Sequence, residues 1–423
     1  MSKYLNSVKY SMSATLSIAS KSVFYEKIIL ELFSKMTLGS LCLTLPDGRR
    51  INFGEGENSL VACIEIKDTN FFKRCVLYGD IGFGESYVEG EWDTNNIQNV
   101  IKWFLLNIEN APSVSGSKSQ SFVINIFKFF NKIYHSKRTN SVGGSRKNIS
   151  EHYDLNNTFF SLFLDPTMTY SSAYFKKEGM TLEEAQIAKY DRLCKQLHLK
   201  PSDHVLEIGS GWGGNAIYIA KTYGCKVTSL TISEEQFKLA NERIRKENLS
   251  DKVSVILKDY RLMEGKFDKL VSIEMLEAVG AEFYNAYFKK CSDFLKPNGI
   301  FAIQAITCPD NRFENLKNNV DWIQKHIFPG SLLPSVGAIN KSINEVCDLT
   351  LVDLKDLGLD YAHTLKIWQQ EFMKNIEEVK KLGFDDYFIR KWNYYFCYCE
   401  AAFAMRNINV MQLVYSRPNN TGR

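Results

Sequence analysis

Through the middle of the chain, short apolar runs alternate with longer segments in which apolar residues recur every three or four positions. Five apolar runs have the length and the residue types of buried strands: 205–208, 226–232, 253–257, 267–274 and 300–306. Strands that alternate with helices in this way form a parallel sheet. We therefore predict a doubly wound α/β domain that binds its ligands at the carboxyl ends of the strands.

Two helix starts can be read directly from the sequence. Thr181 and Glu184 have the spacing of a capping box, which predicts a helix that continues to Leu197. Ser233 follows the second apolar run and precedes Gln236 by three positions, so it predicts the cap of the next helix. Both signals support the strand and helix alternation of the large domain.

Polar side chains stand at or just after the carboxyl ends of the predicted strands. These ends meet at one edge of a parallel sheet, so we expect the side chains to converge in one crevice. The residues are Glu207, Thr231, Asp259, Glu274, Glu277 and Gln304.

The first 110 residues predict a small α+β domain. Residues 39–53 have the pattern of two strands joined by a turn at Asp47 and Gly48. A segment rich in glycine and aromatic residues follows at 75–92, and a helix is expected at 97–106. No catalytic group of residues is recognisable here, so we expect this domain to bind substrate, or a partner, rather than to do chemistry.

Residues 111–150 contain basic residues but no Asp or Glu, and begin as a Ser-, Gly- and Pro-rich linker. Within them, 122–134 has the pattern of an amphipathic helix, with its apolar face formed by Phe122, Ile126, Phe129, Phe130 and Ile133. Such a helix can lie in an anionic lipid interface. The alternative is a helix docked on the protein's own core, next to a solvated basic linker.

The last part of the chain, 309–423, is predicted to be mostly helical and is rich in aromatic residues, with a bent loop at 328–334. It could form core or enclose an apolar substrate. Together with 151–308 it is assigned to one large domain, 151–423.

Composition narrows the function classes. The net charge of +4 over 423 residues is too small to indicate nucleic-acid binding. The 10 cysteines and 6 histidines have no zinc-site spacing, so no metal is expected, and a reduced cytosolic compartment fits best. No run approaches the roughly 20 apolar residues of a membrane span.

A glycine-rich turn follows the first predicted strand of the large domain. Gly209, Gly211 and Gly213 precede a helical pattern, an arrangement that lets a ligand approach the backbone and the helix N-terminus. The spacing differs from that of a dinucleotide fold, although Gly214 also satisfies the looser template. A turn that serves only tight packing is the alternative.

The motifs together resemble the cyclopropane-fatty-acyl-phospholipid synthases, which are relatives of the mycolic acid methyltransferases. The resemblance covers about 39–417 and is carried by 79–92, 152–155, 164–171, 206–214, 231–236, 259–261, 274–280, 328–330 and 412–417. It implies a Rossmann-like class I methyltransferase sheet with helical insertions. It also implies S-adenosylmethionine as the methyl donor.

By the same resemblance, the residues around the donor can be named. They are Tyr170, Ser171, Glu207, Gly209, Ser210, Gly211, Gly213, Thr231, Ser233, Gln236, Tyr260 and Arg261. Several of them end the first three predicted strands, where the strand pattern independently expects a ligand.

The resemblance further implies a bicarbonate that acts as the base. Its cradle maps to Glu277, Tyr361, Ser172, Gln304, Ile306 and Cys399. Ser172 stands where the family has a cysteine, whereas Gln304 and Ala278 stand where it has histidines. Gln304 can form hydrogen bonds but cannot titrate as a histidine does. This combination is similar to a subgroup that includes enzymes leaving a methylene or methyl branch.

The expected function is therefore cyclopropanation of unsaturated phospholipid acyl chains at a bilayer surface, by a cytoplasmic, peripherally bound enzyme. The resemblance also allows a homodimer, although the sequence does not give the oligomeric state. A methylene- or methyl-branched product, a small-amine N-methyltransferase and a non-catalytic donor-binding protein are the alternatives.

Overall fold

The computed structural model describes residues 23–54, 60–108 and 156–421. The predicted linker and amphipathic helix at 111–150, and the motif at 152–155, lie outside these ranges. The described residues form two compact units. One unit holds the residues before 109 together with Asp385–Ala401, and the other holds 156 to Phe384 together with the residues from Ala402 onward.

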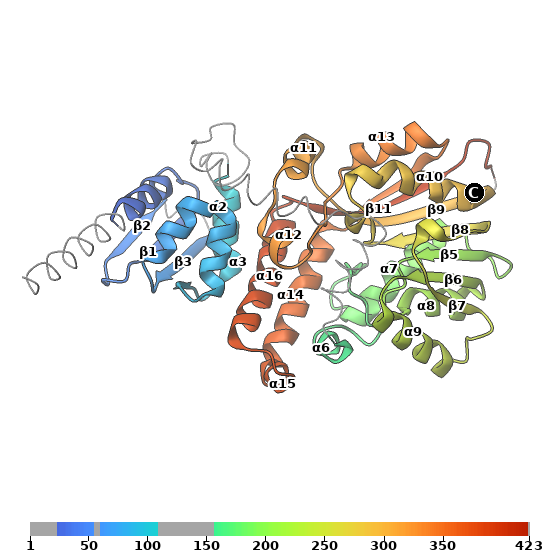
Figure 1. Cartoon of the computed structure of the whole chain (residues 1–423), viewed down its shortest axis with the longest axis horizontal. Coiled ribbons are helices and arrows are strands. Elements are labelled where there is room, and N and C mark those ends of the chain that lie inside the picture. Colours follow the sequence, from blue (N-terminus) through green and yellow to red (C-terminus); the bar gives the residue numbers. More distant parts are fainter. Residues whose placement is uncertain (1–22, 55–59, 109–155, 422–423) are drawn as a thin grey trace, which may run out of the picture. The chain divides into compact units, whose positions relative to one another are not determined.

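The N-terminal unit is an α+β domain, as predicted (Figure 1). Its sheet has the order β2-β1-β3-β4, formed by β1 (Ser40–Thr44), β2 (Arg50–Phe53), β3 (Val61–Ile66) and β4 (Trp92–Asp93). Strands β1 and β2 are antiparallel and lie on either side of the predicted turn. Helix α3 (Ile97–Leu106) is where the sequence predicts it and is capped by Asn96.

The glycine- and aromatic-rich segment belongs to helix α2 (Asn70–Val88), which is kinked at Gly79. The φ angle of +59° at this residue explains the kink, since such a backbone favours glycine. Gly82 is required for a different reason. A Cβ there would lie 2.2 Å from the carbonyl oxygen of Arg74.

One part of the predicted domain division differs from the structure. Helix α16 (Asp386–Ala404) was assigned to the large domain, but its residues up to Ala401 pack with the N-terminal unit. The Arg390 guanidinium donates to the carbonyls of Tyr87 and Trp92 at 2.7 and 3.0 Å. The rings of Tyr394 and Tyr87 lie 5.6 Å apart. An apolar helical pattern does not reveal which core the helix joins, so this return to the N-terminal unit could not be predicted from the sequence.

The large unit contains a seven-stranded sheet of order β10-β11-β9-β8-β5-β6-β7. Its strands are β5 (His204–Ile208), β6 (Lys226–Thr231), β7 (Val253–Leu257), β8 (Phe267–Ile273), β9 (Leu295–Thr307), β10 (Thr350–Asp356) and β11 (Asn409–Ser416). The five strands predicted from the sequence are present and are mutually parallel. β11 runs antiparallel between β9 and β10.

Helices and short helical turns connect and flank these strands. The helices are α6 (Asn157–Ser161), α7 (Leu182–Gln196), α8 (Gly214–Tyr223), α9 (Glu234–Lys246), α10 (Tyr284–Phe294), α11 (Asp310–Asn318), α12 (Trp322–His326), α13 (Val336–Val346), α14 (Gly358–Lys374) and α15 (Ile376–Lys381), and the turns are η1 (Tyr260–Leu262), η2 (Leu276–Ala278) and η3 (Ala281–Phe283). The predicted capping box of Thr181 and Glu184 starts α7, and Ser233 caps α9.

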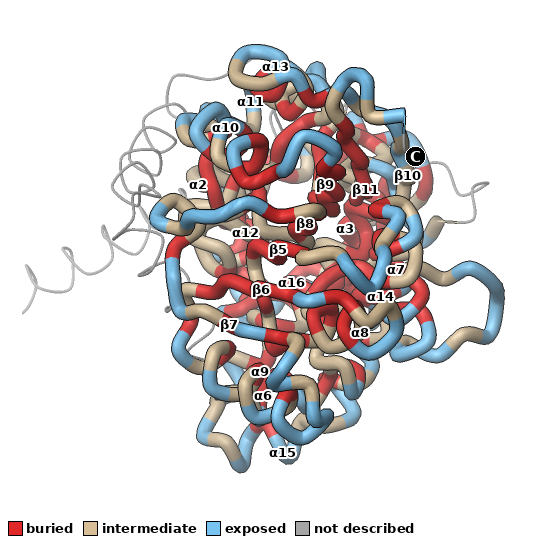
Figure 2. Tube along the Cα trace, turned by 90° about the vertical axis from the view of Figure 1, so that its right-hand side faces the viewer, coloured by how far each residue is buried: buried red, intermediate tan, exposed pale blue. Residues whose placement is uncertain are grey.

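The central strands of the sheet are buried on both faces, because helices cover each side (Figure 2). Strand β9 illustrates the alternation. Phe301 and Ile303 join a core with α10 and α13, whereas Ile300 and Ala302 face a second core with α7, α8 and α9. Near-continuous apolar strands are the expected result of covering both faces of a parallel sheet.

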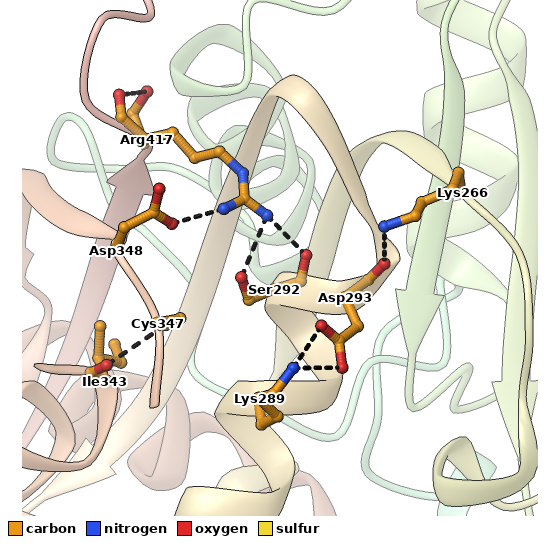
Figure 3. Close-up of polar contacts among 9 residues, drawn as sticks. Lys266, Lys289, Ser292, Asp293, Ile343, Cys347, Asp348 and Arg417 are labelled. Atoms are coloured by element: carbon orange, nitrogen blue, oxygen red, sulfur yellow. Dashed lines mark hydrogen bonds and ion pairs between the residues drawn. The ribbon is translucent and has the colours of Figure 1, made fainter. Parts of the chain in front are cut away.

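The sequence did not predict β10 and β11, since 309–423 was expected to be mostly helical. The end of β11 is fixed by Arg417, whose guanidinium donates to Asp348 at 2.5 Å and to the Ser292 carbonyl and hydroxyl at 2.9 and 3.1 Å (Figure 3). These contacts hold the C-terminal segment against α10.

No helix within the described ranges is long and apolar enough to span a membrane. Within the same ranges, no three His, Cys, Asp or Glu side chains lie together as a metal site would require.

Candidate active site

The glycine turn leads from β5 into α8. Some of its glycines are required by close packing, whereas Gly211 is not. A Cβ at Gly214 would lie 2.7 Å from the Thr167 carbonyl, and one at Gly213 would lie 3.3 Å from the Ala240 side chain, so packing requires both. Gly211 has a φ angle of +48°, yet a Cβ there would meet no described atom within 4 Å. Tight packing therefore accounts for part of the turn but not for Gly211.

Glu207 holds this turn in place through hydrogen bonds to the neighbouring helix and strand. Its carboxylate accepts the Asn215 amide at 2.8 Å and the Ser229 hydroxyl, which joins β5 to α8 and to β6. Burial raises the pKa of Glu207 to about 7, and the two hydrogen bonds oppose this rise. The carboxylate oxygens thus already have partners within the protein.

The predicted ribose-side residues cap helix α9. The Thr231 hydroxyl donates to the Gln236 side chain at 2.9 Å and accepts the Ser233 N–H at 3.1 Å. The Ser233 hydroxyl accepts the Gln236 N–H at 3.3 Å. These contacts set the conformation of the strand end from which a ligand would be recognised.

At the end of β7, Tyr260 and Arg261 lie in turn η1. The Arg261 guanidinium forms two bonds with Asp259, at 2.9 and 2.7 Å, and lies 5.6 Å from the centre of the Tyr260 ring. The ion pair keeps Arg261 beside the aromatic face, as recognition of a planar group would require.

Arg243 is a residue that the sequence analysis did not select. Its guanidinium donates to the carbonyls of Thr167 and Trp212, both at 2.8 Å, and to that of Pro166 at 3.1 Å. It therefore ties the loop before Tyr170 to the glycine turn. Its position on α9 within a strongly charged segment gave no sign of this role.

The segment from Thr169 to Phe175 is tied to its surroundings by hydrogen bonds. The Ser171 carbonyl accepts the Gln186 amide at 3.0 Å, and its hydroxyl accepts the ammonium of Lys189 at 2.6 Å. The Phe175 N–H donates to Asp360 at 2.7 Å. Because its polar groups are paired, this segment can be buried, and it fits a fixed wall better than a lid.

Aromatic rings line the same segment. The Tyr170 ring lies 5.2 Å from Trp368, 5.4 Å from Phe160 and 6.4 Å from Phe328, measured between centroids. The residues come from four separate stretches of the chain. Aromatic faces attract a cation and offer it no nucleophile.

Several of the predicted cradle residues converge on Glu274. Its Oε1 accepts the Ser172 N–H at 2.8 Å and the Gln304 amide at 2.7 Å, and the Tyr361 hydroxyl also bonds to this carboxylate. Glu274 has a φ angle of +48°, which is uncommon for a residue with a side chain. The sequence analysis selected Glu274 only as a strand-end acid, not as a cradle residue.

Glu277 lies one turn further on, in η2. Its Oε1 accepts the Ile306 N–H, and its Oε2 has no hydrogen-bond partner within the described part of the chain. Burial raises the pKa of Glu277 to about 8, and the charge of Glu274 adds to this rise. At neutral pH this carboxyl therefore holds a proton.

The structure thus brings together Ser172, Gln304 and Tyr361 around one carboxylate, and Glu277 with Ile306 at a second. The Ser172 hydroxyl itself donates to the Ala173 carbonyl at 3.0 Å. Cys399 is half-buried in α16 and belongs to the N-terminal unit. Its place in the cradle stays a prediction.

A second residue that the sequence analysis did not select is Lys189 on α7. It is fully buried, with an exposed fraction of 0%, and its charge acts on Glu274 and Asp165. Its spacing from Ala185 and Leu193 places a charged residue on the apolar face of an amphipathic helix. A charged residue among apolar ones on a helix face was therefore the feature of the sequence that could have identified Lys189.

Comparison with known proteins agrees with this geometry. The family model described as mycolic acid cyclopropane synthetase matches residues 141–413. The chain belongs to this family. It is 38% identical to the cyclopropane-fatty-acyl-phospholipid synthase of Escherichia coli K12 over 366 residues, or 86% of this chain and 90% of that one. It is 37% identical to a tuberculostearic acid methyltransferase of Mycobacterium tuberculosis, over 80% of this chain and 79% of the relative.

Solved structures of the family share the fold. The cyclopropane synthase MmaA2 of Mycobacterium tuberculosis superposes with a TM-score of 0.60 at 28% identity, covering 64% of this chain and 98% of that one. A mycolic acid cyclopropane synthase in complex with SAH and CTAB also gives 0.60, at 29% identity, over 64% of this chain and 98% of that one.

These matches confirm the predicted family, the class I methyltransferase fold and the enzyme class. This family member is an S-adenosylmethionine-dependent methyltransferase.

Proposed function

We propose that the enzyme transfers a one-carbon unit from S-adenosylmethionine to the double bond of an unsaturated phospholipid acyl chain, forming a cyclopropane ring. The observation that carries this proposal is the pair of carboxyls after β8, the half-buried Glu274 and the buried Glu277. Tyr361, which bonds to Glu274, lies 5.9 Å from Trp368 of the aromatic wall, measured between ring centroids. The support for the proposal from the comparisons is the similarity over 86% of the chain to a cyclopropane-fatty-acyl-phospholipid synthase.

We assign the donor site to the turn from Gly209 to Gly213, with Glu207 holding the turn. Thr231, Ser233 and Gln236 form one wall, Tyr260 and Arg261 a second, and Tyr170 and Ser171 a third. The bare backbone at Gly211 fits a ligand that approaches closely. When bound, S-adenosylmethionine supplies an electrophilic methyl group.

The remaining chemistry requires little from side chains. The π electrons of the double bond would form a bond to the methyl carbon as the carbon–sulfur bond of the donor breaks and its electron pair stays on sulfur. Positive charge would then develop on the other alkene carbon. The aromatic faces of Tyr170, Trp368 and Phe160 stabilise that charge without trapping it. Loss of a proton from the new methyl group then closes the ring.

A methylene-branched product is the second candidate. In this case a hydride first moves from the newly methylated carbon to the neighbouring cationic carbon. Proton loss from the methyl group then forms a double bond between these two carbons instead of a ring. Two observations favour it. Gln304 stands in place of a titratable histidine and bonds to Glu274, and one relative is named for tuberculostearic acid. A saturated methyl branch would need a reductant in addition.

We also propose that the enzyme works at the cytoplasmic surface of a phospholipid bilayer and that, as the family resemblance implies, it can form a homodimer. The support is the acid-free, basic composition of 111–150 and its amphipathic pattern. A substrate chain anchored in a bilayer has to be reached from that surface.

The test is incubation with methyl-labelled donor and vesicles of a monounsaturated phospholipid, followed by mass spectrometry and proton NMR of the lipid. Label in the acyl chain with cyclopropane methylene signals is expected, whereas vinylidene signals would select the second candidate. Label only in an added soluble amine would overturn the proposal in favour of N-methylation.

A further inference from the structure

Three of the six residues that the resemblance assigns to a bicarbonate cradle already bond to a side chain of the protein. Ser172 and Gln304 donate to Oε1 of Glu274 at 2.8 and 2.7 Å, and Tyr361 bonds to the same carboxylate. A bicarbonate would need these donors for its own oxygens. It therefore does not fit among them while Glu274 is in this position.

We propose that the Glu274 carboxylate is the resident base of this enzyme and does the work that a bound anion would otherwise do. The inference rests on the proposed function. In the step itself, a carboxylate oxygen removes a proton from the newly transferred methyl group. The electron pair of that C–H bond forms the carbon–carbon bond to the cationic carbon. The products of the step are a neutral ring and a protonated Glu274.

The surroundings stabilise the charged form of this carboxylate. Lys189 is buried beside it, and its ammonium, which donates to Ser171 at 2.6 Å, acts on the charge of Glu274. Burial raises the pKa of Glu274, whereas Lys189, Gln304 and Ser172 oppose that rise. A buried carboxylate with a raised proton affinity is a stronger base than one in water.

A series of side-chain hydrogen bonds determines which atom of the Gln304 amide faces Glu274. Arg192 can only donate, and it donates to the Gln412 oxygen at 2.8 Å. The Gln412 nitrogen therefore faces the Gln304 oxygen, at 2.9 Å. The Gln304 nitrogen is left to face Glu274, so the arrangement presents a donor to the carboxylate and stabilises its anionic form.

The backbone conformation of Glu274 also supports a functional role for this residue. A φ angle of +48° is unfavourable for a residue with a side chain. Such a conformation persists only where the surrounding contacts hold it in place. Glu277 has a different environment, since its Oε1 accepts the Ile306 N–H and its Oε2 has no hydrogen-bond partner within the described part of the chain. The donors of the predicted cradle therefore select Glu274, not Glu277, as the carboxylate that they surround.

The test uses the full chain and its Glu274→Gly, Glu274→Gln and Glu274→Asp variants, with vesicles as above, in carbon dioxide-free buffer with or without added bicarbonate. The wild type should label lipid equally in both buffers. Glu274→Gln should lose at least about 100-fold in turnover, and Glu274→Asp should keep part of it. Glu274→Gly should be inactive until bicarbonate or formate is added.

Calorimetry with bicarbonate gives a readout that does not depend on turnover. The wild type should give no binding heat and Glu274→Gly should give one, while donor binding stays intact in both. Bicarbonate binding by the wild type, or loss of its lipid labelling on depletion, overturns the inference. If the wild type labels no lipid in either buffer, the proposed function fails, and calorimetry still decides which anion the donors hold.

Discussion

Glu274 and Gln304 are paired twice. The side-chain amide of Gln304 donates to the Glu274 carboxylate at 2.7 Å, and the main-chain N–H of Glu274 donates to the Gln304 carbonyl at 2.7 Å. The second bond extends the β8–β9 pairing beyond the end of β8. The carboxylate is therefore held by the backbone of the sheet as well as by the side chains around it.

Replacing Gln304 by Leu should remove the amide that links Glu274 to Gln412. Two buried polar groups would then lack a partner, which costs about 1–3 kcal/mol each. We expect a lower melting temperature, together with a loss of turnover that exceeds any loss of donor affinity. Gln324→Leu is a suitable control, since Gln324 caps α12 by means of its side chain. Equal loss of turnover in both variants would contradict a specific role.

Lys189→Met should leave the Glu274 carboxylate without its buried counter-charge. Loss of this nearby positive charge leaves the negative charge of Glu274 less compensated, which destabilises the fold. Adding Glu274→Gln should restore most of the stability, since no uncompensated charge remains. Thermal unfolding of the two single variants and the double variant measures this coupling. Additive losses would show that the two groups do not interact.

Gly211→Ala should weaken donor binding more than it weakens the fold. The φ angle of +48° makes any side chain unfavourable by about 1–2 kcal/mol. Gly48→Ala in the β1–β2 turn is a matched control, because its φ angle is +85° and a Cβ there also meets no described atom within 4 Å. Both variants should lose similar stability, but calorimetry should find weaker donor binding only in Gly211→Ala.

Arg243→Ala should loosen the glycine turn, because three carbonyls lose one shared donor. We expect a destabilisation of about 3 kcal/mol and weaker donor binding. The neighbouring Arg245 is exposed and donates only within its own helix at 3.2 Å, so Arg245→Ala provides the control. Unchanged donor affinity in Arg243→Ala would show that the turn is stable without it.

The Glu277 carboxyl should make stability depend on pH. Its pKa rises from 4.5 to about 8 on folding, so between these values the folded state binds the proton and the unfolded state does not. This contribution is complete below pH 4.5 and is lost as the pH rises through about 8. Glu277→Gln removes this titration. The melting temperature of the variant should therefore rise relative to that of the wild type as the pH is raised from 5 to 9. Parallel curves would contradict the raised pKa.

Much of the fold could be predicted from local patterns. Five apolar runs gave the parallel strands, and Thr181 with Glu184 gave the start of α7, because these signals act over a few residues. β10 and β11 escaped prediction, since they pair with strands far away in the chain and carry no short-range turn signal. The return of α16 to the N-terminal unit likewise depends on long-range packing.

The sequence by itself determined the family, the glycine turn after β5 and the set of polar residues at the strand ends, because spacing and residue type suffice for these. Only the tertiary structure decided which carboxyl those residues surround. Ser172, Gln304 and Tyr361 come from a loop, a strand and a helix, and the direction of a hydrogen bond between them depends on Gln412 and Arg192, which lie elsewhere in the chain. The distinction between Glu274 and Glu277 depends on burial and on neighbouring charge, which are properties of the folded chain.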